Sequence, residues 1–175
     1  NTYSKYNTKL IKIFTLKKSD VDHCQEMVDL IIDHPSFDKE KSLAKQALFI
    51  SCSVPGDICF KKLLKLYDDD VNIVDYNGLD LLTHAVQHQN KEVFSYILNN
   101  EKFDSRKCNL LYVYVKSFSF LEVQNDIFDC IKKNSSSIDF NEILPNGETF
   151  LTSILNLITR KNLKDYLQVF EFICN

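Results

Sequence analysis

The sequence predicts an all-α fold made of about five stacked helix-turn-helix units. Apolar residues recur with the spacing of helices, as in the stripe Tyr6, Leu10 and Ile13 near the start. Only three Gly and three Pro occur in 175 residues, which is few for a turn-rich all-β protein. Residues 140–151 also match 71–82 without a gap, 69 residues later. An offset of roughly twice 33 to 36 residues is typical of stacked repeats, which usually bind through a surface.

The bounds of the first three units are predicted from apolar stripes with helical spacing and from the turn residues between them. The first, residues 1–38, is expected to be a helix pair that ends at His34-Pro35, since the residue before proline avoids the α region. The second, 39–72, has expected helices over 41–53 and 58–66, separated by Pro55-Gly56-Asp57. The third, 73–105, has the clearest pattern, and its expected helices span 81–88 and 91–98.

The last two units are less regular. The fourth, 106–141, has an expected first helix over 109–115, an insertion over 117–124 and a second helix over 125–132. The β-branched and aromatic residues in 111–118 also fit a strand, but the repeat phase favours a helix. The fifth, 142–175, has expected helices over 149–157 and 163–174. Five units then form one repeat domain, which we expect to belong to a longer protein.

Composition argues against several classes of partner and location. The net charge is −3, and the basic residues are 19 Lys with only two Arg, so no nucleic-acid partner is expected. The longest apolar run, Leu110 to Val115, is far shorter than the roughly 20 residues that cross a bilayer, so no membrane partner is expected. Six Cys lie in apolar stretches with no short pairing, which favours free thiols in an intracellular protein over disulfides or zinc.

The third and fifth units resemble ankyrin repeats. The match to that family is strongest over 71–105 and fair over 39–72 and 138–175. The matching residues of the third unit are Asp75, Gly78, Leu82, Ala85, Glu92, Val93, Ile97 and Leu98, and those of the fifth are Gly147, Thr149 and Leu151. Gly78 and Gly147 are expected to take a positive φ in a tight turn, and Asp80 and Thr149 to cap the helices that follow. The resemblance implies an ankyrin-type solenoid with short finger loops.

The resemblance also implies a binding surface. In ankyrin proteins the finger loop and the exposed side of each first helix form a concave binding face. Carried over, the candidate partner-binding residues are Tyr76, Asn77, Leu79, Gln87 and His88 in the third unit, and Pro145, Asn146, Glu148, Asn156 and Leu157 in the fifth. Tyr76 is the preferred anchor, because tyrosine brings contact area and a hydroxyl at low entropic cost.

We expect no catalytic residues, no metal and no cofactor. His84 and His88 have the i, i+4 spacing of a metal pair, but the glutamate of H-E-x-x-H and an evident third ligand are absent from the sequence around them. Asp68-Asp69-Asp70 lacks the alternating ligands of a calcium loop. A surface pair and a repeat-closing loop are the simpler interpretations.

The expected function is therefore non-catalytic binding of a protein partner, within the cytoplasm or the nucleus. A host-directed effector or viral modulator, acting in host cytoplasm, is one context that fits the Lys-, Asn-, Ile- and Phe-rich composition. The alternative is a regulatory or substrate-docking domain of an enzyme whose catalytic part lies elsewhere. The last helix carries large hydrophobic residues on two sides, with Tyr166, Phe170 and Ile173 on one and Val169 and Phe172 on the other. We expect further repeats, another domain or a partner chain to cover it.

Overall fold

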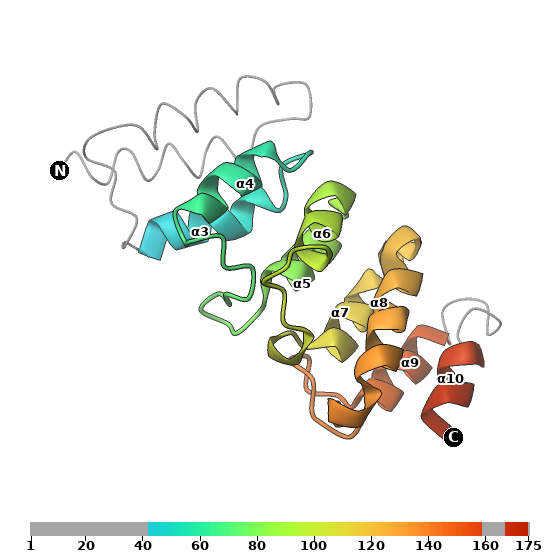
Figure 1. Cartoon of the computed structure of the whole chain (residues 1–175). Helices are drawn as coiled ribbons and strands as arrows, with labels where there is room; N and C mark the ends of the chain where they lie inside the picture. Colours follow the sequence, from blue (N-terminus) through green and yellow to red (C-terminus); the bar gives the residue numbers. More distant parts are fainter. Residues whose placement is uncertain (1–41, 159–166, 175) are drawn as a thin grey trace, which may run out of the picture. The chain divides into compact units, whose positions relative to one another are not determined.

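A computed structural model describes residues 42–158 and 167–174 of the chain (Figure 1). Over these residues the secondary structure is helical, with isolated β-bridges and no strand, which confirms the all-α expectation. The chain divides into two compact units, Asn1–Phe103 and Asp104–Asn175. The expected first helix pair, in 1–38, lies outside the described residues.

The helices of the first unit are α3 (Ser42–Ser51), α4 (Ile58–Lys65), α5 (Leu81–Gln87) and α6 (Lys91–Leu98). Those of the second are α7 (Leu110–Lys116), α8 (Leu121–Asn134), α9 (Phe150–Ile158) and α10 (Leu167–Cys174), with 3-10 turns η2 (Ser105–Lys107), η3 (Ser117–Ser119) and η4 (Ser135–Ser137). In α3 to α7 and in α9 the bounds lie within two residues of the expected ones. For the last helix, the expected start at 163 lies outside the described residues.

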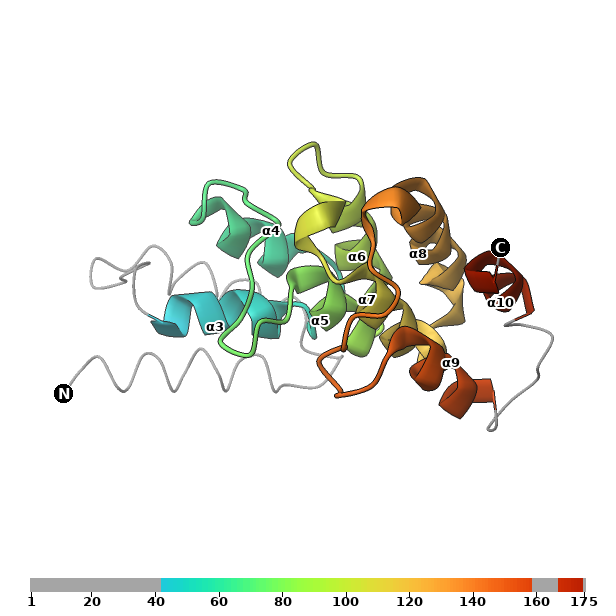
Figure 2. The ribbon, with the colours of Figure 1, turned by 90° about the horizontal axis from the view of Figure 1, so that it is seen from below.

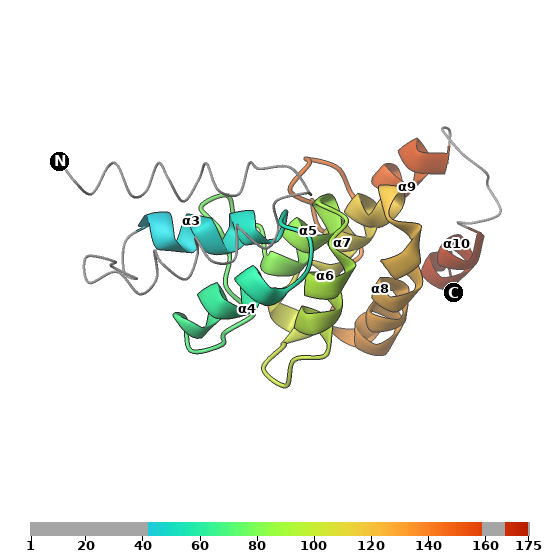
Figure 3. The same ribbon diagram turned by 90° about the horizontal axis from the view of Figure 1, so that it is seen from above.

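In the first unit two helix pairs stack on each other. α3 packs on α4 and α5 on α6, and Figures 2 and 3 show α3 beside α5 and α4 beside α6. Phe60 of α4 and Tyr96 of α6 meet edge to face, with ring centroids 5.9 Å apart. Phe60, Leu63 and Leu64 are fully buried, because the i, i+3 and i+4 spacing gives α4 one apolar side.

Asn90 ties the two pairs of the first unit together through polar contacts. Its side-chain oxygen accepts from the backbone N–H of Val93 at 3.1 Å and caps α6. Its side-chain nitrogen donates to the carbonyls of Val54 at 2.6 Å and Gly56 at 3.0 Å, in the turn between α3 and α4. The residue is only 5% exposed, so one amide satisfies a helix end, the buried carbonyl of Val54 and the part-buried carbonyl of Gly56.

In the second unit α7 lies against two other helices. α7 packs on α8 and on α9, and the rings of Tyr114 and Phe150 lie 5.9 Å apart between α7 and α9. Phe128 of α8 meets Phe172 of α10 edge to face at 5.6 Å. Val169 is 2% exposed, so one side of α10 is covered within the unit.

The expected insertion over 117–124 is wrong in its second half. α8 begins at Leu121, not near 125, and only residues 117–120 separate it from α7. The reason is a continuous stripe of Val123, Ile127 and Ile131, each at most 1% exposed. The strand alternative for 111–118 is also wrong, since α7 covers most of it.

The 69-residue repeat is also present in the backbone. Val74 bridges Asp80, and Ile143 bridges Thr149, each pair closing a short loop before a helix. We call these loops, residues 74–80 and 143–149, the two fingers. Gly78 and Gly147 take φ values of 78° and 80°, as expected for the tight turn. Asp80 accepts from Thr83 N–H at 2.7 Å and Thr149 from Thr152 N–H at 3.3 Å, which confirms both expected caps.

The described residues bear on two expectations from composition, one about membrane-spanning helices and one about disulfides. In this part of the chain no helix is long and apolar enough to cross a membrane. Cys52, Cys59, Cys108 and Cys130 are not in disulfides. Burial raises the pKa of the Cys52 thiol far above its ordinary value, so this cysteine behaves as part of the core.

Candidate recognition groove

The first unit contains a groove of about 630 Å³ between α3, α5 and the first finger. It is lined by Gln46, Phe49, Ile50, Ser53, Asp75, Tyr76, Asn77, Leu79, His84, Gln87 and His88. Its size falls within the range of ordinary ligand pockets. We call it the α3–α5 groove.

Helical spacing explains why these side chains converge. Gln46, Phe49 and Ile50 lie on one side of α3 at i, i+3 and i+4. His84, Gln87 and His88 repeat that spacing along α5 and at its C-cap. The finger supplies the rest, because its turn projects Tyr76 into solvent with 84% of its surface exposed.

All five candidates from the third repeat line this one groove. Tyr76, Asn77, Gln87 and His88 are exposed and Leu79 is half-buried. The opposite wall, from Gln46 to Ser53, is not among the predicted site residues, because the sequence pattern over 41–53 predicts only a core helix. The signal was present as two polar residues, Gln46 and Ser53, seven apart on the side that carries Phe49 and Ile50.

Asp75 and His84 fasten the finger to α5. The ring nitrogen Nε2 of His84 lies 3.0 Å from Oδ2 of Asp75, and the two side chains are 17% and 7% exposed. The other carboxylate oxygen accepts from the backbone N–H groups of Asn77 at 2.7 Å and Leu79 at 2.9 Å. Phe49 packs against the His84 ring, with centroids 4.9 Å apart. His84 is therefore part of the groove wall rather than one of a pair of exposed imidazoles.

The pKa of Asp75 lies below its ordinary value. Burial alone would raise it, but hydrogen bonds from Leu79, His84 and Asn77 outweigh burial and favour the carboxylate. The pKa of His88 is also lowered, first by partial burial and then by the neighbouring His84. Both shifts favour the unprotonated form of the group.

We expect Asp75→Asn to reduce the loss of stability at acid pH. Because the folded-state pKa of Asp75 is depressed, its contribution is full above about pH 4 and is lost as pH falls through the lowered value. Urea unfolding of the variant between about pH 5 and pH 2 should give a flatter pH profile than the native chain. Glu92→Gln, which removes an exposed carboxylate from α6, is the control. Parallel profiles for Asp75→Asn and the native chain would contradict this assignment.

The five candidates of the fifth repeat lie in the second unit, where Glu148 links the other two polar candidates. Asn156 donates to Oε1 of Glu148 at 2.8 Å, and Asn146 to Oε2 at 3.2 Å. Ser153 also donates to Oε2, at 2.7 Å. Pro145 is exposed and Leu157 is half-buried. The two candidate sets belong to different units of the chain.

The two fingers hold the same shape with different side chains. At the 69-residue offset, Leu144 replaces Asp75, Glu148 replaces Leu79 and Ser153 replaces His84. The carboxylate of the first finger is at its second residue, Asp75, and that of the second finger is at its sixth, Glu148. In both fingers the carboxylate bonds to a side chain of the helix that follows, His84 or Ser153. The backbone bond that closes the finger is 2.8 Å in both, from Asp75 to Leu79 and from Leu144 to Glu148.

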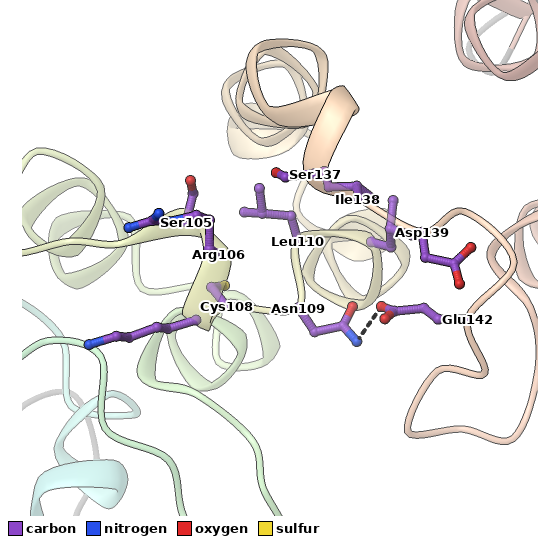
Figure 4. Close-up of a pocket in the computed structure, with 11 residues that line it drawn as sticks. Ser105, Arg106, Cys108, Asn109, Leu110, Ser137, Ile138, Asp139 and Glu142 are labelled. Atoms are coloured by element: carbon purple, nitrogen blue, oxygen red, sulfur yellow. Dashed lines mark hydrogen bonds between the residues drawn. The ribbon is translucent and has the colours of Figure 1, made fainter.

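A smaller cavity of about 220 Å³ lies in the second unit (Figure 4). Ser105, Arg106 and Cys108 line one side, and Ser137 and Asp139 the other. Asn109 donates to Glu142 at 2.9 Å across its edge. The guanidinium of Arg106 is paired with Asp104, at 2.9 and 3.0 Å. The cavity contains none of the candidate residues, and its paired charges of both signs suggest no single ligand.

Among residues 42–158 and 167–174, no three His, Cys, Asp or Glu side chains are placed to hold a metal ion. The acidic run 68–70 forms a turn, in which Oδ1 of Asp70 accepts from Asn72 N–H at 2.9 Å. No family model, curated protein or solved structure matches the chain.

Proposed function

We propose that this chain is a non-catalytic recognition module of the ankyrin type that binds a protein partner through the α3–α5 groove. The observation that carries the proposal is the convergence of Tyr76, Asn77, Leu79, Gln87 and His88 on one hollow with an apolar floor. A large exposed aromatic at the edge of such a hollow is the usual anchor of a protein interface. Ring contacts between neighbouring helix pairs, Phe60 with Tyr96 in the first unit and Tyr114 with Phe150 in the second, also support a stacked-repeat arrangement.

The proposal extends to the C-terminal helix pair. Leu151 and Leu155 are 41% and 47% exposed on α9, one turn apart. The residues at the same positions of α5, Leu82 and Val86, are 1% and 0% exposed. This contrast supports cover by another helix pair, from the same or another polypeptide. We also place the module inside the cell, which the buried Cys52, a thiol outside any disulfide, supports.

Replacing Tyr76 and His88 together by alanine should weaken partner binding by roughly tenfold or more, the usual effect of truncating central anchor residues. The measurement is an affinity pull-down with the purified chain, in which each partner band is quantified against added competitor. Glu92→Ala with Glu101→Ala, two exposed residues outside the groove, is the matched control. Equal recovery by the native chain and the groove variant would exclude the groove as the binding surface.

A further inference from the structure

We infer, on the basis of the proposed recognition function, that the occupant of the α3–α5 groove is an uncharged, extended peptide segment of another protein. A large apolar side chain of this segment enters the groove. Its peptide groups meet the free amide side chains around the rim. Three observations on the lining residues lead to this class of partner.

The first observation is charge. The eleven lining residues include no Lys or Arg and only one carboxylate, that of Asp75. Asp75 is 7% exposed at its side chain and already has two backbone donors and the His84 ring. A phosphate or acidic segment would need Arg or Lys for charge-assisted bonds, and a basic segment would need an accessible carboxylate. The groove offers neither, so a neutral segment fits best.

The second observation is the apolar surface. Phe49, at 5% exposed, forms part of the floor with Ile50, and Leu79 closes the finger end. Tyr76 stands beside them with most of its ring in solvent. An aliphatic or aromatic side chain placed between Tyr76 and Phe49 would remove apolar area of both partners from water.

The third observation is a ring of unused amides. Within the part of the chain that the structure describes, the side chains of Gln46, Asn77 and Gln87 make no hydrogen bond, although they border one groove from α3, the finger and α5. Each amide offers two donors and one acceptor oxygen. A helical partner has satisfied its own backbone groups, whereas an extended segment still presents free N–H and C=O groups. The amides therefore favour an extended segment over a helix.

The test uses a phage-displayed library of random peptides, selected on the whole chain and read by sequencing. We expect enriched peptides with an uncharged centre around Leu, Met, Phe or Trp, whose binding is lost on Tyr76→Ala. For the enriched peptides, Asn77→Asp and Gln87→Glu should each weaken binding at least tenfold, because each places a charge of nearly the same shape where a neutral contact was. Gln168→Glu, the same change at an exposed position of α10, should leave binding unchanged.

The outcomes separate this inference from the proposed function. Enrichment of basic peptides that bind more tightly to Asn77→Asp, or of acidic peptides, would overturn the neutral partner while leaving the groove as the recognition surface. Enriched peptides that adopt a helix when bound, as measured by circular dichroism, would overturn the extended segment alone. No enriched peptide, or only peptides that bind Tyr76→Ala and the native chain equally well, would count against both.

Discussion

Replacing Phe60 by alanine is expected to lower the free energy of unfolding of the first unit by about 3–5 kcal/mol, the usual cost of truncating a buried aromatic. Phe60 is 0% exposed, and its ring meets Tyr96 of the neighbouring helix pair. The substitution therefore removes contacts within α3–α4 and between the two pairs. The cavity left behind lies at the junction that keeps α4 against α6.

Urea denaturation followed by circular dichroism measures this effect, since a lower transition midpoint with an unchanged slope reports stability alone. Ile58→Ala is the matched control, because Ile58 starts the same helix but is 50% exposed. We expect the control to cost less than about 1 kcal/mol, half or less of what full burial of such a side chain provides. Equal losses for the two variants would contradict the assigned orientation of α4.

Asn90→Ala is expected to cost about 2–4 kcal/mol, because three bonds disappear together. Loss of the α6 cap accounts for about 1 kcal/mol. The buried carbonyl of Val54 then lacks its donor, at about 1–3 kcal/mol, and the part-buried carbonyl of Gly56 loses its bond as well, at a smaller cost. The expected total lies below the full sum, since neighbouring terms are not additive.

Asn90→Asp separates the two roles of Asn90. The aspartate keeps an oxygen for the Val93 N–H but has no donor for the two carbonyls. We expect it to be as destabilising as alanine or more so, because it also places a charge next to carbonyl oxygens. Asn99→Ala is the control, since Asn99 is exposed and its side chain donates only to Ser95 at 2.8 Å. A variant Asn90→Asp with native stability would show that the contact with the α3–α4 turn is dispensable.

The positions of most helices could be predicted because the sequence marks their ends. Pro55-Gly56-Asp57 precedes α4, Asp80 caps α5 and Asn90 caps α6, each by a residue type with a direct physical role. α8 has no comparable mark, since Phe120 stands at its N-cap position without a side-chain cap. The sequence therefore predicts its start at 125, four residues late, although its apolar stripe is continuous.

The groove could be predicted only in part for a different reason. Tyr76, Gln87 and His88 belong to one repeat, so the pattern of that repeat alone predicts that they face the same side of it. The opposite wall belongs to the preceding repeat, and the rotation between two helix pairs depends on packing such as that of Phe60 against Tyr96 and Phe49 against His84. A periodic pattern predicts which side of a helix is apolar, but it does not predict which side of a neighbouring helix that side will contact.

The exchange of the carboxylate between the two fingers has a consequence for how such surfaces can change. Asp75 with His84 and Glu148 with Ser153 stabilise the same loop from different positions. The shape of the finger therefore does not depend on one fixed set of side chains. Substitutions at Tyr76 in the first finger, or at Pro145 in the second, leave the groups that anchor the finger intact. Variation at the tip can alter what is recognised while the scaffold persists, so the binding preference of one repeat can diverge from that of another within a single gene.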